Sequence, residues 1–287
     1  MAALVTVAPP GGGGRAAATS PPDYYVSLGD SYGAGYQPIP SALTGTDSNG
    51  FAYQVVQLAR AKGYRFILKN FACDAATTTS ILTEQGCKYP VSGGDGATYP
   101  KQTQAVAAEQ FIAKHRGEVG LVTVSIGGND ILSCTTPAVV LSCEAGVMAT
   151  IKTNLATLLN GLRRAAGSRT RIVGSTYPDV VLGLYVSDPA EESLARTSVG
   201  VFRRLLNPTL RAQYDAVGGS LVDVTQAAGS YIPLDKTTDL APYGTIPEAV
   251  ADLCHLTYYC QVQDIHPRAA GYRVIARLIV KTLPSHR

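Results

Sequence analysis

Ser31 is the first residue of this chain whose type and setting could support chemistry. It follows a short apolar segment, residues 24–28, and lies between Gly29 and Gly33. Glycines permit the sharp turn that leaves a serine at the end of a buried strand, and open α/β sheets bind ligands at that edge. A serine hydroxyl alone is a weak nucleophile and requires a base and a site for the developing oxyanion. Because a serine in a glycine-rich turn is most often structural, the other groups decide the interpretation.

His266 is the candidate base, which takes the serine proton and returns it to the leaving group. Asp264 lies two residues earlier, so its carboxylate can accept a hydrogen bond from the imidazole Nδ1, although it could also cap the following helix. Of the other histidines, His115 is expected at an exposed helix end and His286 in the terminal tail. His255 lies between two nearby cysteines, where we expect it to face solvent, and is the alternative base.

Asn129 is the candidate side-chain donor for an oxyanion. It follows two glycines and precedes Asp130, and its amide N–H could point toward a negatively charged oxygen. The backbone N–H groups of Ser31 and of Ala75, which lies in a turn of small residues, are the other predicted donors. Removing one such donor typically lowers a reaction rate by about 10²–10³.

Strands and helices that alternate along the chain must position these groups. Strands are predicted over residues 24–28, 65–71, 119–126, 171–176 and 220–224, and helices over residues 50–61, 101–114, 144–166, 189–216 and 267–282. This alternation implies right-handed βαβ units and an α/β fold: a three-layer α/β/α sandwich with a central parallel sheet of about five strands. The turns after parallel strands open on the same edge, so the candidate residues should converge there. Residues 225–263 show little periodicity and are predicted to form a long functional loop.

Composition restricts the class of protein. The chain has 287 residues, of which 46% are hydrophobic and 16% charged, and its net charge of +3 is too small to indicate a nucleic-acid partner. We find no stretch of about 18 apolar residues and therefore expect no membrane span. Residues 1–22 are expected to be a disordered tail or the remnant of a leader, and residues 23–287 a single domain that acts as a monomer.

The six cysteines fall into three close pairs, which are Cys73 and Cys87, Cys134 and Cys143, and Cys254 and Cys260. Six cysteines allow 15 complete connectivities, and the sequence alone does not choose among them. The spacings do not match a metal site, so we expect disulfides that staple local loops, and no metal or cofactor. Disulfides indicate a secreted, extracellular protein.

Three short motifs resemble the SGNH (GDSL-type) hydrolase family. Gly29-Asp30-Ser31-Tyr32 is similar to its first block, Gly127-Gly128-Asn129-Asp130 to its third, and Asp264-Ile265-His266-Pro267 to its fifth. The resemblance extends over residues 23–283 and implies an SGNH/flavodoxin-like fold and ester hydrolysis through an acyl-serine, without a cofactor. The three short disulfides are similar to those of the family's secreted bacterial esterases and lipases.

Two positions depart from the family pattern. Tyr32 replaces the leucine of the first block, and Ala75 occupies the place of a second-block glycine whose N–H joins the oxyanion hole. Alanine keeps the N–H but adopts a positive φ only at a cost. If the alignment slips by one residue, Asp74 is the donor instead.

Other functions remain open at this point. Gly29, Ser31 and Gly33 also satisfy the Gly-x-Ser-x-Gly pattern of α/β-hydrolases, but those enzymes carry their acid and base on separate loops. A secreted binding module without catalysis and a carbohydrate O-acetylesterase are further alternatives. We expect the partner to be a small-molecule or lipid ester, held by the loops at residues 33–45, 87–100 and 225–263.

Overall fold

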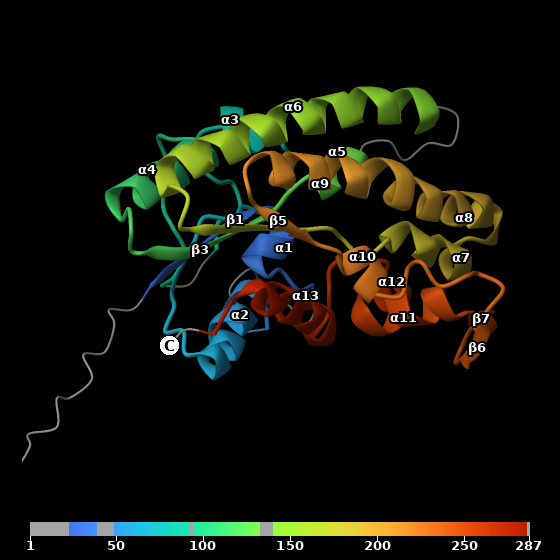
Figure 1. The fold of residues 1–287 in the computed structure, drawn as a ribbon. Coiled ribbons are helices and arrows are strands. Elements are labelled where there is room, and N and C mark those ends of the chain that lie inside the picture. The colour runs from blue at the N-terminus through green and yellow to red at the C-terminus, as the bar shows by residue number, and fades with distance from the viewer. Residues whose placement is uncertain (1–22, 39–48, 92–93, 133–139, 286–287) are drawn as a thin grey trace, which may run out of the picture.

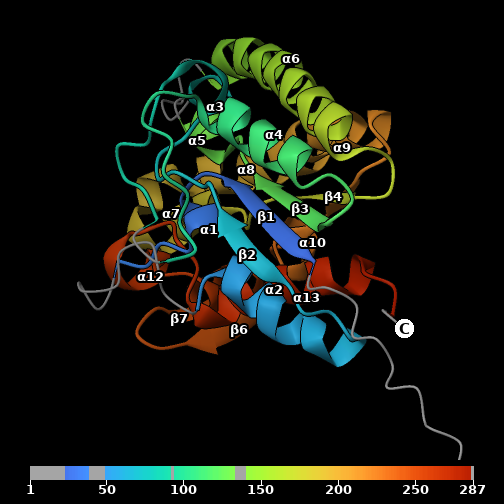
Figure 2. The same ribbon diagram turned by 90° about the vertical axis from the view of Figure 1, so that its left-hand side faces the viewer.

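A five-stranded parallel sheet forms the centre of the computed structural model, which describes residues 23–38, 49–91, 94–132 and 140–285. Its strands are β1 (Tyr24–Gly29), β2 (Ile67–Asn70), β3 (Val119–Ser125), β4 (Arg171–Ser175) and β5 (Ser220–Val222). They run side by side in the order β2-β1-β3-β4-β5, and every neighbouring pair is parallel. Figure 2 shows β2, β1, β3 and β4 of this sheet. This order is the flavodoxin-like one, so the predicted fold class is confirmed.

Helices cover both faces of the sheet. The longer ones are α2 (Phe51–Ala59), α4 (Gln104–Lys114), α6 (Val140–Ala166), α8 (Glu192–Val201), α9 (Asn207–Ala216), α11 (Glu248–Leu256) and α13 (Ala269–Thr282). The shorter ones are α1 (Ser31–Ala34), α3 (Ser80–Thr83), α5 (Gly128–Leu132), α7 (Leu184–Ser187), α10 (Val224–Ala227) and α12 (Tyr259–Val262). Helices α4, α6 and α9 lie on one face, and α2 and α13 pack together on the other (Figure 1). The three layers follow the sequence prediction.

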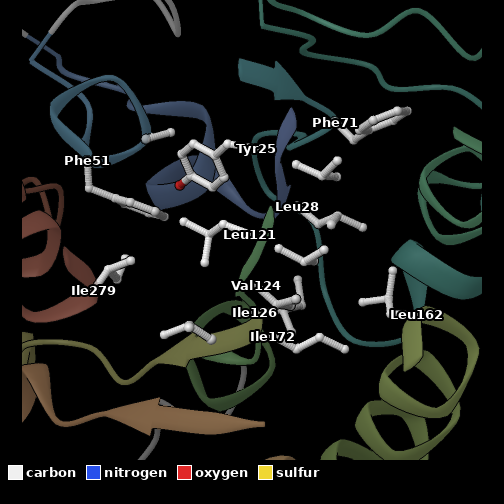
Figure 3. Packing of buried hydrophobic residues seen from close by; sticks show 14 of the residues in the cluster. Tyr25, Leu28, Phe51, Phe71, Leu121, Val124, Ile126, Leu162, Ile172 and Ile279 are labelled. Carbon is white, nitrogen blue, oxygen red and sulfur yellow. The ribbon is translucent and has the colours of Figure 1, made fainter. Parts of the chain in front are cut away.

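The core lies between these layers. Strand β1 is buried from its second residue to its last, and β3 is almost as fully buried, as expected for parallel strands that helices cover on both sides. Phe51 and Ile279 reach the sheet from α2 and α13, and Leu162 reaches it from α6 (Figure 3). Burying a side chain of this size contributes about 1.5–3 kcal/mol, so this packing fixes the carboxyl edge from which the site residues emerge.

Gly29 ends β1 at a point where only glycine fits. Its φ is +126°, and an added Cβ would lie 1.8 Å from the carbonyl oxygen of Ser125 on β3. The Gln104 side chain holds the same residue by accepting from its N–H and donating to its carbonyl, at 2.7 and 3.1 Å. The chain therefore leaves the sheet at a fixed angle just before Ser31.

The helix predicted over residues 189–216 is present, but its middle is underwound. A 3₁₀ turn, η3 (Pro189–Glu191), leads into α8, and a π-helical segment, η4 (Phe202–Leu206), joins α8 to α9. Pro208 lies in the first turn of α9 and has no N–H to donate to the preceding turn. The widened π turn accommodates this missing bond, and such turns are frequent at functional sites.

The prediction of a loop over residues 225–263 is wrong. This segment contains α10, α11, α12 and an antiparallel hairpin of β6 (Thr237–Leu240) and β7 (Gly244–Pro247). Helix α11 buries Val250 and Leu253 in a second apolar cluster with Leu182, which lies in the 3₁₀ turn η2 (Val180–Gly183). Small residues and short elements weakened the periodic signal.

Several sequence predictions concern residues outside the described part of the chain, namely the tail at residues 1–22, Cys134 and His286. In the described part, none of the helices combines the length and the apolar character that crossing a membrane requires.

Candidate active site

Ser31, His266 and Asp264 form one hydrogen-bonded chain. The Nε2 atom of His266 lies 2.8 Å from the Oγ of Ser31, and its Nδ1 lies 2.7 Å from the Oδ1 of Asp264. Ser31 is the first residue of α1, directly beyond β1, whereas the other two precede α13, more than 230 residues later in the chain. The fold therefore joins a hydroxyl, an imidazole and a carboxylate in the order that an activated serine requires.

The Asp264–His266 segment is held in a tight turn. Asp264 Oδ1 also accepts the backbone N–H of His266 at 2.9 Å, so one oxygen fixes both the ring and the main chain of the histidine. Burial raises the pKa of the Asp264 carboxyl, but the hydrogen bonds from His266 and the charge of its ring outweigh this effect and hold the pKa below its usual value. Asp264 therefore stays ionised beside the imidazole. The tilted Tyr36 ring lies 4.4 Å from the His266 ring and covers one side of it.

Asp30, which directly precedes Ser31, helps to position it by capping helix α1. Its Oδ1 accepts the backbone N–H of Tyr32 at 3.0 Å, which caps α1, and its Oδ2 accepts the hydroxyl of Tyr177 at 2.5 Å. Burial raises the pKa of Asp30 to about 7, although the bonds from Tyr177 and Tyr32 oppose this rise. The site thus contains a second carboxyl group, which titrates near neutrality and adjoins Ser31 in the chain. The sequence analysis did not identify it, although it stands inside the first motif.

Ala75 has the backbone conformation that the sequence analysis considered costly. Its φ is +61°, and apart from Gln263 it is the only described non-glycine residue with a positive φ. The turn around it is tied on two sides: the N–H of Cys73 donates to the Gly29 carbonyl at 2.9 Å, and the amide of Asn129 donates to the Ala76 carbonyl at 2.8 Å. Ala75 is therefore held in a glycine-like conformation next to the Ala76 carbonyl that Asn129 binds.

Asn129 lines the same pocket as Ser31, near the start of α5. Its amide nitrogen carries two hydrogens, so the bond to Ala76 does not exhaust its capacity to donate. The neighbouring Asp130 accepts from the backbone N–H and the hydroxyl of Thr78, at 2.9 and 2.5 Å. The third motif is thus hydrogen-bonded to the turn that carries Ala75, and the sequence did not reveal these bonds. Ala75 itself lines a different hollow with Asp74, which shares no lining residue with the pocket beside Ser31.

Replacing Ala75 by glycine should stabilise the protein. A left-handed conformation costs an L-residue about 1–2 kcal/mol, and glycine avoids this cost. Part of the gain is offset, because glycine also has more conformational freedom in the unfolded chain. We expect a net gain of about 1 kcal/mol, or about 2–4 °C in Tm, with the backbone N–H retained. Thermal unfolding measures this effect. Ala76→Gly is the matched control and should lower Tm, because Ala76 is buried without a positive φ. Equal losses in both variants would contradict the expected strain.

The remaining histidines lie away from Ser31 wherever the structure describes them. His255 is exposed on α11, as predicted, and His115 contacts Glu118 at the end of α4. Neither is hydrogen-bonded to the serine. Among the described residues, no group of three or more His, Cys, Asp or Glu side chains could hold a metal ion.

Two of the three proposed cysteine pairs form disulfides in the described residues, Cys73–Cys87 and Cys254–Cys260. Each one staples a segment of the site. The first closes directly before Ala75. The second joins α11 to α12, where the N–H of Tyr258 donates to the His266 carbonyl at 3.0 Å. The pairing of Cys143 involves Cys134, outside the described residues, and stays a prediction.

An apolar pocket opens beside Ser31. Its wall beyond Ser31 and Asn129 is mostly aliphatic and aromatic, and includes Ile131, Leu132, Val180, Val181, Phe202, Leu206 and Ile265. A second hollow shares most of this wall and continues to Leu184, Leu194 and Val201. The empty space of the second hollow, its open mouth included, is about 1190 Å³. Both turns η2 and η4 contribute walls, so the irregular helical segments shape this pocket.

Asp179, which directly precedes the pocket residue Val180 in the chain, is another buried carboxyl. It is fully buried, its Oδ2 lies 2.7 Å from the Ser198 hydroxyl on α8, and burial raises its pKa to about 7. Between about pH 4 and pH 7 the unfolded chain carries this group ionised while the folded protein keeps it protonated. The folded state therefore loses stability as the pH rises through this window.

Asp179→Asn should remove this loss of folding stability at higher pH, because the amide of Asn does not ionise. The rise from the usual pKa of 3.8 to about 7 corresponds to about 4 kcal/mol. We therefore expect the Tm difference, variant minus wild type, to be several degrees more positive at pH 8 than at pH 4.5. Thermal unfolding at both pH values tests this. Asp215→Asn, which changes an exposed carboxyl on α9, is the control for charge. A Tm difference for Asp179→Asn that does not vary with pH would contradict the assignment.

Comparisons with known proteins agree with this fold. The family model described as GDSL-like Lipase/Acylhydrolase family matches residues 27–274. The chain resembles the extracellular lipase of Streptomyces rimosus, with a TM-score of 0.51 and 18% identity, over 90% of this chain and 98% of that one. It also resembles phospholipase A1 of Streptomyces albidoflavus NA297, with a TM-score of 0.53 and 20% identity, over 91% of this chain and 98% of that one.

A third structure, the lipase Lip_vut3 from a goat rumen metagenome, has a TM-score of 0.54 and 16% identity, over 90% of this chain and 95% of that one. At these identities the structures show a common fold. The sequence matches no curated protein.

Proposed function

Because the chain belongs to the GDSL-like lipase/acylhydrolase family, we propose that it is a secreted serine hydrolase that cleaves carboxylic esters through an acyl-serine intermediate. The observation that carries this proposal is the hydrogen-bonded chain Ser31–His266–Asp264, with distances of 2.8 and 2.7 Å. These are the distances at which a base activates a serine and a carboxylate orients the base.

The first half of the proposed reaction acylates the serine. The Ser31 oxygen attacks the ester carbonyl carbon while His266 Nε2 takes the serine proton. Asp264 accepts the Nδ1–H bond and stabilises the imidazolium that forms. The Ser31 and Ala75 N–H groups and the Asn129 amide hold the oxyanion. When the tetrahedral intermediate collapses, the bond to the leaving oxygen breaks, and His266 gives its proton to the departing alcohol.

The second half releases the acid. Water attacks the acyl-serine carbonyl, His266 takes one proton from the water, and the same donors hold the second oxyanion. Collapse breaks the bond to Ser31, whose oxygen recovers a proton from His266. The scheme uses only protein groups and water, and requires no metal or cofactor.

The apolar pocket supports an acyl group as the part of the substrate that the protein binds. The walls near Ser31 carry mainly Val, Leu, Ile and Phe side chains. The second hollow extends this surface with further Leu and Val side chains, and its lining also includes the polar residues Glu191, Thr197 and Gln263. Such surface favours hydrocarbon over sugar hydroxyls, since an unpaired buried hydroxyl costs free energy. We therefore favour fatty acyl esters over O-acetylated glycans.

Secretion is supported by the two disulfides, since such bonds persist in oxidising compartments. Both disulfides join segments that lie close in the chain to proposed site residues, namely Ala75 and Asp264.

A series of p-nitrophenyl esters from acetate to palmitate tests the proposal. We expect turnover by the wild-type protein and a kcat/KM that rises from acetate to esters of medium or long chains. Activity on acetate alone would contradict the acyl pocket and favour an O-acetylesterase. If no ester of the series is hydrolysed, a binding module becomes the better interpretation.

A further inference from the structure

Tyr32, which directly follows the serine, connects α1 to the segment that carries His266. Its phenol hydroxyl donates to the backbone carbonyl of Ile265 at 2.7 Å. Ile265 lies between Asp264 and His266, so adjacent residues of α1 make two parallel contacts: Ser31 meets His266, and Tyr32 meets Ile265. The sequence analysis noted Tyr32 only as a departure from the leucine of the family motif.

The Tyr32 bond fixes the peptide group that precedes His266. The carbonyl of this peptide accepts from Tyr32, and its N–H donates to Asp264 Oδ1 at 2.9 Å. A peptide group bonded at both ends cannot rotate freely, and its plane sets the direction in which the His266 side chain leaves the backbone. The two bonds therefore determine where the imidazole lies relative to Ser31.

The surroundings keep the Tyr32 hydroxyl in place as a donor. The side chain is only 3% exposed, and its ring packs at 5.0 Å against Tyr177 and at 6.1 Å against Tyr272. Burial and the charges of Asp30 and Asp264 raise the pKa of Tyr32 well above its usual value, so the hydroxyl keeps its proton. A leucine here would fill part of the space but could not donate to the carbonyl of Ile265.

We propose that Tyr32 is a positioning residue for the base, whose hydroxyl holds the Ile265–His266 peptide so that the imidazole stays within hydrogen-bond distance of Ser31. The inference rests on the proposed function for its catalytic consequence. Its structural consequence, the fixed segment at residues 263–268, can be measured independently.

Tyr32→Phe removes the hydroxyl and keeps the ring. We expect kcat on p-nitrophenyl esters to fall by about 10- to 100-fold, because a small misplacement of a catalytic group has effects of this size. The KM should change by less than about threefold, since the pocket is unaltered. Tyr214→Phe is the control, because Tyr214 is also buried and its hydroxyl bonds a backbone carbonyl, that of Val124, at 3.2 Å in the core. It should cost comparable Tm but leave kcat near the wild-type value.

Hydrogen exchange of the backbone amides supplies the second readout. In Tyr32→Phe, residues 263–268 should exchange faster than in wild type, while Tyr214→Phe leaves their exchange unchanged. Unchanged exchange in Tyr32→Phe, or a kcat within about twofold of wild type, would overturn the inference. The two proposals can fail separately. If the wild-type protein is inactive on esters but Tyr32→Phe exchanges faster at residues 263–268, the proposed function is refuted, whereas the role of Tyr32 in holding this segment is supported.

Discussion

Ser31→Ala should lower kcat/KM for p-nitrophenyl esters by at least about 10³-fold, the scale expected when a nucleophile is removed. The substitution deletes one oxygen from a nearly buried side chain, so the fold and its Tm should change little. The variant can still bind the ester beside the oxyanion donors, but this binding accelerates the attack of water on the ester only weakly. Initial rates over a range of substrate concentrations measure the effect.

The matched control is Ser27→Ala. Ser27 is fully buried on the same strand that leads to Ser31, and its hydroxyl faces Thr123 on β3. This variant should keep wild-type kcat/KM within a few fold even if its Tm decreases. Full activity in Ser31→Ala, or an equal loss in both variants, would exclude Ser31 as the nucleophile.

His266→Ala should produce a loss of similar size, at least about 10³-fold in kcat. Without the imidazole, the Ser31 proton has no acceptor and the leaving alcohol no donor, so both halves of the reaction are impaired. Since the serine and the base act as one unit, the double variant Ser31→Ala/His266→Ala should be scarcely less active than either single variant. Steady-state kinetics of the three proteins measure this non-additivity.

His255→Ala is the control, because His255 is exposed on α11 and was the alternative base in the sequence analysis. It should retain wild-type activity. A large loss in this variant together with an active His266→Ala protein would reverse the assignment of the base.

Much of the fold could be predicted from the sequence because its signals are local. Continuous apolar runs such as residues 119–126 identify buried parallel strands, and the turns that follow such strands must meet at one edge. Ser31 and Asn129 follow two of these strands, and the spacing of Asp264 and His266 lets one carboxylate orient the neighbouring ring. The contact between Ser31 and His266, which lie 235 positions apart, was expected from this convergence and from the motifs that resemble a known family.

Other long-range contacts could not be predicted in this way. The bond from Tyr32 to Ile265 spans 233 positions, and the clasp between Thr78 and Asp130 spans 52. The protonation of Asp30 depends on complete burial, which no pattern around it indicates. The apolar pocket could not be predicted either, since its walls come from α5, η2 and η4, which only the folded chain brings together.

Ala75 shows where sequence and structure inform each other. The sequence identified an alanine at a position where glycine is usual, and the structure shows that its φ is indeed positive, at +61°. Such local strain persists only where the surrounding bonds determine the conformation. Here the ties at Cys73 and Ala76 supply that constraint, and the retained N–H is the property that the proposed oxyanion hole requires.

Direct detection of the acyl-enzyme is the most decisive test of the account. The wild-type protein would be mixed with a p-nitrophenyl ester, quenched in acid within the first turnovers, digested and analysed by mass spectrometry. We predict that the peptide containing Ser31 gains the mass of the acyl group, and that this adduct is absent from Ser31→Ala. An acyl group found on another residue, or rapid hydrolysis without any adduct on Ser31, would contradict the central claim.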